Sequence, residues 1–135
     1  MLNFFGGNKK LHGSFESQIA AICDDIAYNN NDIDDGLYAG LFQLEELEQI
    51  EIVRKVIAKI KLKKNGSSNR FKYELIRNLI NMMVDDLIIN TKSNLKEFKI
   101  ENSQEILQTQ QKLVKFSNYM QNQEKKLKSF LKQRM

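Results

Sequence analysis

The residues best suited to chemistry are acidic side chains and one tyrosine between positions 24 and 35. Asp24, Tyr28 and Asp32 are four residues apart, so on a continuous helix each step would turn by only about 40°. Such a row could line one wall of a cleft. Carboxylate oxygens suit a hard cation, although Mg²⁺ or Mn²⁺ would need further ligands from elsewhere. Spacing alone equally fits a solvated acidic helix face.

Other chemistry-bearing residues are few. Cys23 and His12 are the only cysteine and histidine, which excludes an intramolecular disulfide, a CxxC zinc site and a local HExxH motif. No EF-hand order, phosphate-binding glycine loop or Ser-His-Asp set is present. We interpret Cys23 as a small packed residue beside Ala20 and Ala27, and His12 as an exposed loop residue.

The elements that must position these residues are helices, because the chain has no proline and only six glycines. Residues 1–13 show no periodicity and form an irregular lead-in. Ser14 can cap a helix, and Asp24 and Tyr28 project from the side opposite its apolar stripe, which comprises Phe15, Ile19, Ile22 and Ile26. The cap-favouring residues at 29–36 predict that this helix stops or restarts there.

The remaining pattern is also helical, and we expect an all-α fold with one domain over residues 14–135. Residues 41–64 indicate two helices or one bent helix, and 65–69 indicate a loop. Ser117 can cap a last helix with Met120, Leu127, Phe130 and Leu131 on one side. That helix has no cap before Met135, so the sequence looks cut off inside it.

A helix over 71–96 is apolar around more than half of its circumference and should be central. Asn78, Asn81 and Asp85 form its polar strip, and Arg77 is expected to pair with Asp85 or a neighbour. Apolar surface left uncovered on this helix should drive self-association.

Charge is divided unevenly along the chain. Residues 1–51 hold two lysines and ten acids, net −8, whereas residues 52–135 hold nineteen basic residues and seven acids, net +12. The two parts should attract each other. No aromatic residues alternate with the lysines, which disfavours nucleic-acid binding. Because no long apolar run or secretory leader is visible, we expect a cytoplasmic protein that does not enter the membrane.

Residues 14–41, SFESQIAAICDDIAYNNNDIDDGLYAGL, resemble the HD-superfamily deoxyguanosinetriphosphate triphosphohydrolase-like proteins, in which the segment reads approximately SLEAQ-x-A-x-x-DDIAYN-x-HDIDDGLRAGL. The likeness continues in FKYELIRNLINMMVDDLI (71–88) and KLVKFSNYMQNQEKKLKSFLKQRM (112–135). It covers essentially everything from residue 14 onward and implies a helical fragment of the HD-domain fold.

The resemblance implies hydrolysis of a deoxynucleoside triphosphate, such as dGTP, to the deoxynucleoside and triphosphate with a divalent metal, Mg or Mn. By resemblance Asp24 is a metal ligand, Tyr28 lies by the sugar and Asp32 bonds the sugar hydroxyl. Lys128 matches a basic residue near the phosphates. Homo-oligomers are implied for the full-length family.

The chain departs from the family pattern at several points. Asn31 stands where the family usually has histidine, and Tyr38 where it has arginine. The earlier His and His-Asp metal motifs are absent from the sequence. We therefore expect a C-terminal fragment whose metal site is incomplete in this chain alone, and whose missing ligands come from an N-terminal HD segment in trans. The alternative is a non-enzymatic helical remnant or interaction module from a split gene.

Overall fold

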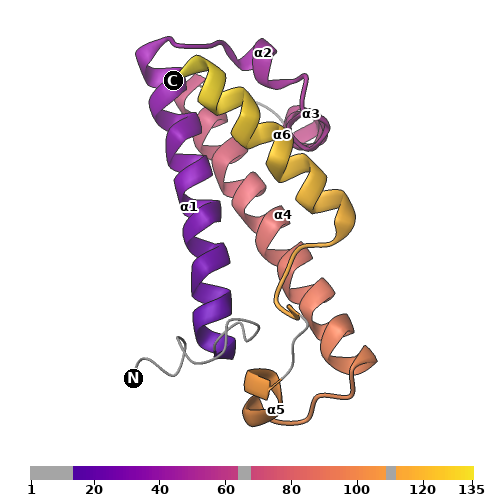
Figure 1. Cartoon of the computed structure of the whole chain (residues 1–135). Coiled ribbons are helices and arrows are strands. Elements are labelled where there is room, and N and C mark those ends of the chain that lie inside the picture. Colours follow the sequence, from indigo (N-terminus) through magenta and orange to yellow (C-terminus); the bar gives the residue numbers. More distant parts are fainter. Residues whose placement is uncertain (1–13, 64–67, 109–111) are drawn as a thin grey trace.

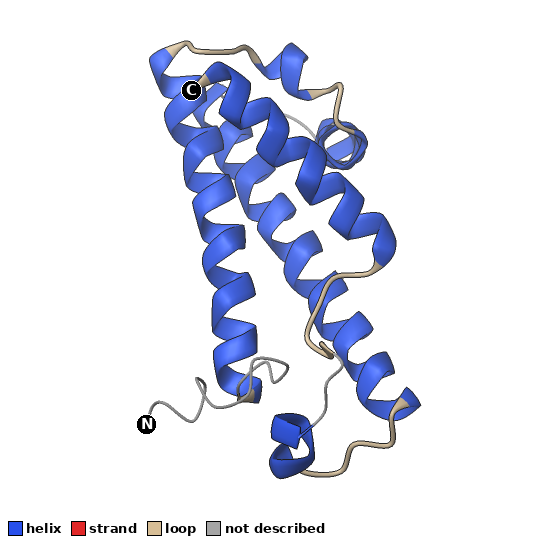
Figure 2. Ribbon diagram, in the orientation of Figure 1, coloured by secondary structure: helices blue, strands red, loops and turns tan. Residues whose placement is uncertain are grey.

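The computed structural model describes residues 14–63, 68–108 and 112–135, which form helices joined by loops, with no strand among them (Figure 2). This confirms the all-α prediction, while the expected lead-in 1–13, with His12, lies outside the described residues. No helix in the described part is long and apolar enough to cross a membrane. The helices are α1 (Phe15–Ala39), α2 (Leu44–Leu47), α3 (Glu51–Lys63), α4 (Ser68–Glu97), α5 (Ser103–Gln108) and α6 (Asn118–Arg134).

Helix α4 is central, as its apolar pattern predicts. It packs against α1 on one side and α3 on another, and α1 also contacts α6. Figure 1 shows α1 and α4 side by side, α6 crossing in front of α4, and α3 seen nearly end-on. The core between them is aliphatic, and its largest fully buried side chains include Ile33, Leu47, Ile52, Leu75, Leu79, Met83 and Leu127.

Helix α1 begins and ends at residues suited to those positions. The Ser14 side chain accepts a hydrogen bond from the Ser17 amide at 3.1 Å, which confirms the predicted N-cap. Gly40 has a φ of 72°, in the left-handed region that an L side chain rarely adopts, and the Leu41 amide donates to the Gly36 carbonyl at 2.9 Å. Because α1 runs from Phe15 to Ala39 without a break, it carries all of the acidic residues from 24 to 35.

The expected stop or restart at residues 29–36 is wrong, because α1 continues to Ala39. Ile33 is fully buried, and both Asn29 and Asn30 are buried beside it. The side-chain amide of Asn30 donates to the Ile26 carbonyl one turn back at 2.8 Å. Tertiary burial of this stretch outweighs the local preference of Asn and Asp for ending helices.

Two smaller expectations need correction, and a third is confirmed. Cys23 is exposed, together with Ala20 and Ala27, because the buried stripe of α1 faces the other way. Residues 65–67 lie outside the described part, but Ser68 and Asn69 of the expected loop already belong to α4. Arg77 pairs with its neighbour Glu74 at 2.8 Å, which confirms the expected ion pair and selects the neighbour over Asp85.

A row of polar side chains on α4 fixes where α6 begins. Asp86 accepts hydrogen bonds from the Ser117 amide at 2.8 Å and hydroxyl at 2.7 Å. Asn90 donates to the Lys115 carbonyl and Asn94 to the Leu113 carbonyl, both at 2.9 Å. Every second residue of the strap at 113–117 therefore contacts one face of α4, where Asn94, Asn90 and Asp86 are spaced four residues apart.

Helix α6 then packs as predicted. The Ser117 hydroxyl accepts from the Met120 amide at 3.2 Å, which confirms the N-cap, and the apolar side formed by Met120, Leu127, Phe130 and Leu131 is buried. Gln123 of α6 is buried as well, and its side-chain oxygen accepts from the Ile52 amide at 2.9 Å. Because that amide lies in the first turn of α3, where no intrahelical acceptor exists, α6 caps α3.

The far end of α6 is held against the turn that follows α1. Phe130 meets Phe42 edge to face with the ring centroids 5.2 Å apart, and Arg134 stacks on Phe130 and donates to Glu46. This hydrogen bond, followed by that from the Gln43 amide, lowers the pKa of Glu46 below its usual value. A Cβ on Gly36 would overlap the Phe42 ring, so the glycine gives that ring its place.

Candidate functional site

The outer face of α1 carries three of the four predicted site residues. Asp24, Tyr28 and Asp32 are all exposed, and Tyr28 keeps 65% of its surface in solvent. Their four-residue spacing on an unbroken helix puts them on one face, one turn apart. The structure thus confirms that Asp24 and Tyr28 project away from the isoleucine core. Asn31 and Tyr38, where the sequence departs from the family pattern, are exposed too.

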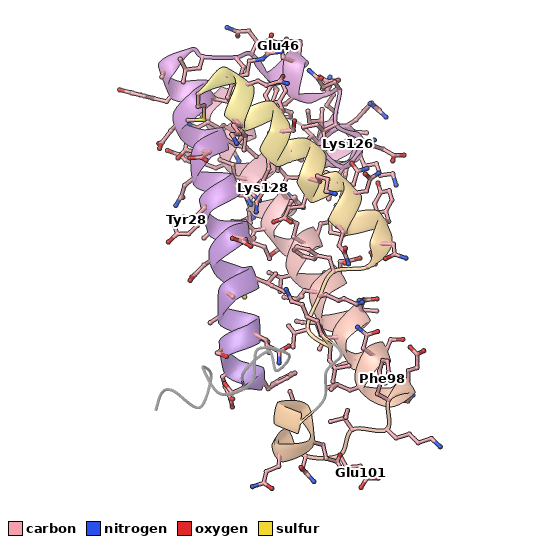
Figure 3. All side chains as sticks on the ribbon, in the orientation of Figure 1. Tyr28, Glu46, Phe98, Glu101, Lys126 and Lys128 are labelled. Carbon is pink, nitrogen blue, oxygen red and sulfur yellow. The ribbon has the colours of Figure 1, made fainter. Side chains whose placement is uncertain are left out.

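Lys128, the fourth predicted site residue, lies at the edge of α1 that faces α6. Its ammonium is 3.9 Å from the Asp25 carboxylate and 3.8 Å from that of Glu124, while the side-chain amide of Asn29 donates to Glu124 at 3.3 Å. Figure 3 shows Lys128 between the two helices and Tyr28 on the side of α1 away from α6. These contacts bring Lys128 to the acidic helix, but to Asp25 rather than to Asp24.

The structure therefore divides the predicted set. Asp24 and Asp25 are adjacent in sequence and so point about 100° apart around the helix. Asp24, Tyr28 and Asp32 form one solvent-facing row, whereas Lys128 stands beside that row in long ion pairs, with about half of its side chain exposed. A side chain held at such distances can turn toward an anion bound on the outer face, because exposed pairs of this kind hold weakly.

Sequence reasoning missed the residues that position Lys128. Asp25, Asn29 and Glu124 supply its surroundings, and Glu124 is the best shielded of the two carboxylates, with 16% of its side chain exposed. One signal was available: Glu124 precedes Lys128 by four residues, the spacing that favours an ion pair along one helix. The Asp25 and Asn29 contacts depend on how α1 and α6 cross, which no local pattern contains.

The other edge of α1 also carries an ion pair, and it is built differently. Asp34 contacts Lys72 of α4 at 2.8 Å, and the Lys72 ammonium lies 5.4 Å from the Tyr73 ring centroid and 6.0 Å from that of Tyr38. Only 19% of the Lys72 side chain is exposed. The hydrogen bond to Asp34, the largest cause, raises the pKa of Lys72 above its ordinary value. This pair joins α1 to α4.

A divalent metal ion would not find its full ligand set here. Within the ranges 14–63, 68–108 and 112–135, no three His, Cys, Asp or Glu side chains are grouped so that they could hold a metal ion. Asp24 offers one exposed carboxylate, and a lone carboxylate competes poorly with water for Mg²⁺. The described residues do not by themselves fit the metal that the resemblance implies.

The chain is similar to several proteins named deoxyguanosinetriphosphate triphosphohydrolase-like protein. It is 40% identical over 121 residues to the protein of that name from Parvibaculum lavamentivorans, covering 89% of this chain and 31% of the relative. The Brucella suis protein is 40% identical over 119 residues, covering 87% and 30%. The Paracoccus denitrificans protein is 35% identical over 129 residues, covering 93% and 34%.

No protein-family model matches the chain. The similarity nevertheless extends over about nine tenths of its length, at an identity of 35% or more, in several bacterial relatives. The chain spans about a third of the length of the curated relatives that it matches. In sequence, the chain is thus similar to one segment, about a third in length, of proteins named deoxyguanosinetriphosphate triphosphohydrolase-like protein.

Proposed function

We propose that this chain is one helical part of a deoxynucleoside triphosphate triphosphohydrolase of the HD type. It supplies the acidic helix α1 and the basic helix α6, and a second polypeptide completes the enzyme. The supporting observation is the identity of 35–40% over about nine tenths of the chain to relatives named for hydrolysis of deoxyguanosine triphosphate. The proposed reaction converts dGTP and water to deoxyguanosine and triphosphate, in the cytoplasm.

The outer face of α1 would recognise the sugar end of the substrate. Tyr28 and Asp32 are one turn apart and exposed, so both can reach one deoxyribose. The Asp32 carboxylate can accept a hydrogen bond from the sugar hydroxyl, and the Tyr28 ring offers an apolar surface with a polar tip. In this proposal the two side chains orient the nucleotide so that its phosphates point toward Lys128 of α6.

Lys128 would serve the phosphates. Its ammonium lies at the α1–α6 edge in two pairs of 3.8–3.9 Å, which a polyanion can outcompete because a triphosphate presents several charges at once. A lysine on a flexible stem contributes charge to the bound and reacting substrate alike. Its loss should therefore weaken substrate binding more than it slows the chemical step.

Asp24 would be one carboxylate ligand of the metal, Mg²⁺ or Mn²⁺, in the complete site. Because the described residues do not supply the rest, the proposal assigns the His and His-Asp ligands to the second polypeptide. The relatives are about three times as long as the matched segment, which is room for such a complement.

The test is reconstitution in trans. The chain is mixed with a separately produced polypeptide that comprises the remainder of the Parvibaculum lavamentivorans relative, and triphosphate release from dGTP is measured together with bound Mn²⁺. We expect neither component alone to hold Mn²⁺ tightly or to release triphosphate, and the mixture to do both. Asp24→Ala should abolish both signals, whereas Asp35→Asn, an exposed matched control on α1, should leave them unchanged.

The alternative is a non-enzymatic interaction module. One observation favours it: the Lys128 charge is already shared between Asp25 and Glu124 within the chain. A mixture that forms a stable complex but neither binds Mn²⁺ nor releases triphosphate would support this reading. Loss of Mn²⁺ binding with Asp35→Asn but not with Asp24→Ala would instead show that the site residues are misassigned.

A further inference from the structure

The C-terminal half of α4 exposes two adjacent isoleucines. Ile88 has 46% and Ile89 has 69% of its surface in solvent, although α4 is the central helix of the fold. A β-branched side chain loses rotamer freedom in a helix, so local preference does not favour isoleucine at an exposed position. Two such residues together form an apolar patch that water solvates poorly, and a covering partner would remove that cost.

The patch is framed by opposite charges at equal distances. Asp85 lies three residues before Ile88, and Lys92 lies three residues after Ile89. All four side chains are exposed and share one face through the spacing i, i+3, i+4 and i+7. In the described part of the chain, no ion pair involves Asp85 or Lys92.

The symmetry extends further along the helix. Exposed Asn81 and Lys96 lie at equal distances from the midpoint between Ile88 and Ile89. We call the exposed set the α4 seam, and it consists of Asn81, Asp85, Ile88, Ile89, Lys92 and Lys96. It lies roughly opposite the Asp86–Asn90–Asn94 row, since the two sets differ by about 150° around the helix. The seam is therefore free of the strap that holds α6.

We propose that the α4 seam binds a second copy of this chain, with the two α4 helices antiparallel and a two-fold axis between Ile88 and Ile89. An isologous contact requires a surface that complements itself, and this seam does. In the antiparallel pair, Asp85 faces Lys92 of the partner subunit and Lys92 faces the partner's Asp85. The four isoleucines meet at the centre between these charge pairs.

The contact should be modest and reversible. A face of one helix offers less area than the roughly 800 Å² per partner of a standard stable interface. The outer row of α1 takes no part in the seam, so this dimer is independent of the proposed activity, and either can fail alone. Because the flanking pairs are exposed, their contribution should decrease as salt screens them.

Sedimentation velocity of the whole chain over a range of concentrations at low salt tests the proposal. The native chain should show a monomer–dimer equilibrium. Asp85→Lys places a lysine on each side of the isoleucine pair, and Lys92→Asp places an aspartate on each side of it. Each single variant should dimerise about tenfold more weakly, because both charge contacts become repulsive.

An equimolar mixture of the two variants should dimerise again, since each heterodimer then contains two opposite-charge pairs. The double variant D85K/K92D should dimerise by itself for the same reason. Asp35→Lys on α1 and Lys125→Asp on α6 change the net charge equally at exposed sites outside the seam, and they should behave like the native chain. Recovery in the mixture also shows that the single variants are folded.

Three results would overturn the proposal. The first is a native chain that stays monomeric at every concentration. The second is association that neither single variant weakens, which would place the contact elsewhere on the molecule. The third is a mixture that associates no better than its separate components, because this would exclude the antiparallel pairing of Asp85 with Lys92 of the partner subunit.

Discussion

The two edges of α1 carry ion pairs of the same composition but different construction. At one edge Asp34 contacts Lys72 at 2.8 Å, and the lysine is mostly shielded. At the other edge Asp25 lies 3.9 Å from Lys128, and both side chains are about half exposed. The first pair is close enough to be a hydrogen bond and the second is not.

This difference separates a structural contact from an available charge. A short pair with a shielded lysine constrains the helices that it joins, whereas a long pair with an exposed lysine stabilises little and leaves that lysine free to bind something else. The edge toward α4 therefore joins α1 to α4, and the edge toward α6 keeps a cation beside the outer row of Asp24, Tyr28 and Asp32.

The largest predicted effect concerns Gly36, near the C-terminal end of α1. In Gly36→Ala the new methyl group would overlap the Phe42 ring, which must move and disturb its contact with Phe130 of α6. We expect a loss of about 1–3 kcal/mol in the free energy of unfolding, measured by urea denaturation. The double variant with Phe42→Val should lose much less than the sum of its single changes.

Gly40→Ala is the matched control for this substitution. Within the described part of the chain, no atom lies within 4 Å of an added Cβ at Gly40, so the expected cost comes from its φ of 72°. That cost should be about 1 kcal/mol and should not depend on residue 42. Equal losses at both glycines, both insensitive to Phe42→Val, would contradict the role given to the Phe42 ring.

The next largest effect is expected for Asp86→Ala, which should loosen the packing of α6 and leave the Asp34–Lys72 contact between α1 and α4 intact. Asp86→Ala removes both hydrogen bonds to Ser117, and with them the start of α6. Hydrogen bonds to a charged group contribute about 1.5–3 kcal/mol, so we expect a loss near 2 kcal/mol. Hydrogen exchange should increase at the first turns of α6, with little change near Lys72. An increase in hydrogen exchange that is equal along the whole chain would contradict a local role for Asp86.

Periodicity and capping residues were sufficient to predict most helices but not how the helices cross. The stripes of α1 and α6 and the caps Ser14 and Ser117 follow from local spacing, and all are confirmed. The break expected at 29–36 fails because Ile33 is buried in a core that only the complete fold supplies. Local preference for a cap amounts to about 1 kcal/mol, which burial of such a side chain exceeds.

The site was predictable only along one helix. The spacing of Asp24, Tyr28 and Asp32 places them on one face without any knowledge of the fold, and the structure agrees. The neighbours of Lys128 depend on the α1–α6 crossing. The Asn90 and Asn94 contacts likewise join side chains to backbone carbonyls, and a carbonyl acceptor has no residue type that could reveal it in the sequence.

A smaller effect distinguishes the α4 edge by its pH dependence. The folded-state pKa of Lys72 lies above its ordinary value of 10.5, so the pair contributes fully below that pH. Its contribution is lost as the pH rises through the raised pKa. Urea midpoints of the native chain and Asp34→Asn should therefore differ at pH 7 and converge once the pH has passed the raised pKa of Lys72. A difference that persists unchanged at high pH would exclude the ion pair as its cause.

The smallest predicted effect on stability is at the α6 edge. Asp25→Asn should change the free energy of unfolding by about 0–0.5 kcal/mol, because the pair is long and half exposed. It should have a larger effect on anion binding, since it removes one of the two charges that compete for Lys128. We expect inorganic triphosphate to bind the whole chain about twofold more tightly, measured by isothermal titration calorimetry at low salt.

Two controls isolate the charge of Lys128 in that experiment. Lys128→Met should weaken triphosphate binding and remove the gain from Asp25→Asn, because the acid then has no lysine to compete for. Asp34→Asn removes the same charge from the same helix and leaves Lys128 untouched, so it should not produce the same gain. If Asp34→Asn tightens binding as much as Asp25→Asn does, the effect is one of net charge alone. The α6 edge would then hold its lysine no more loosely than the α4 edge.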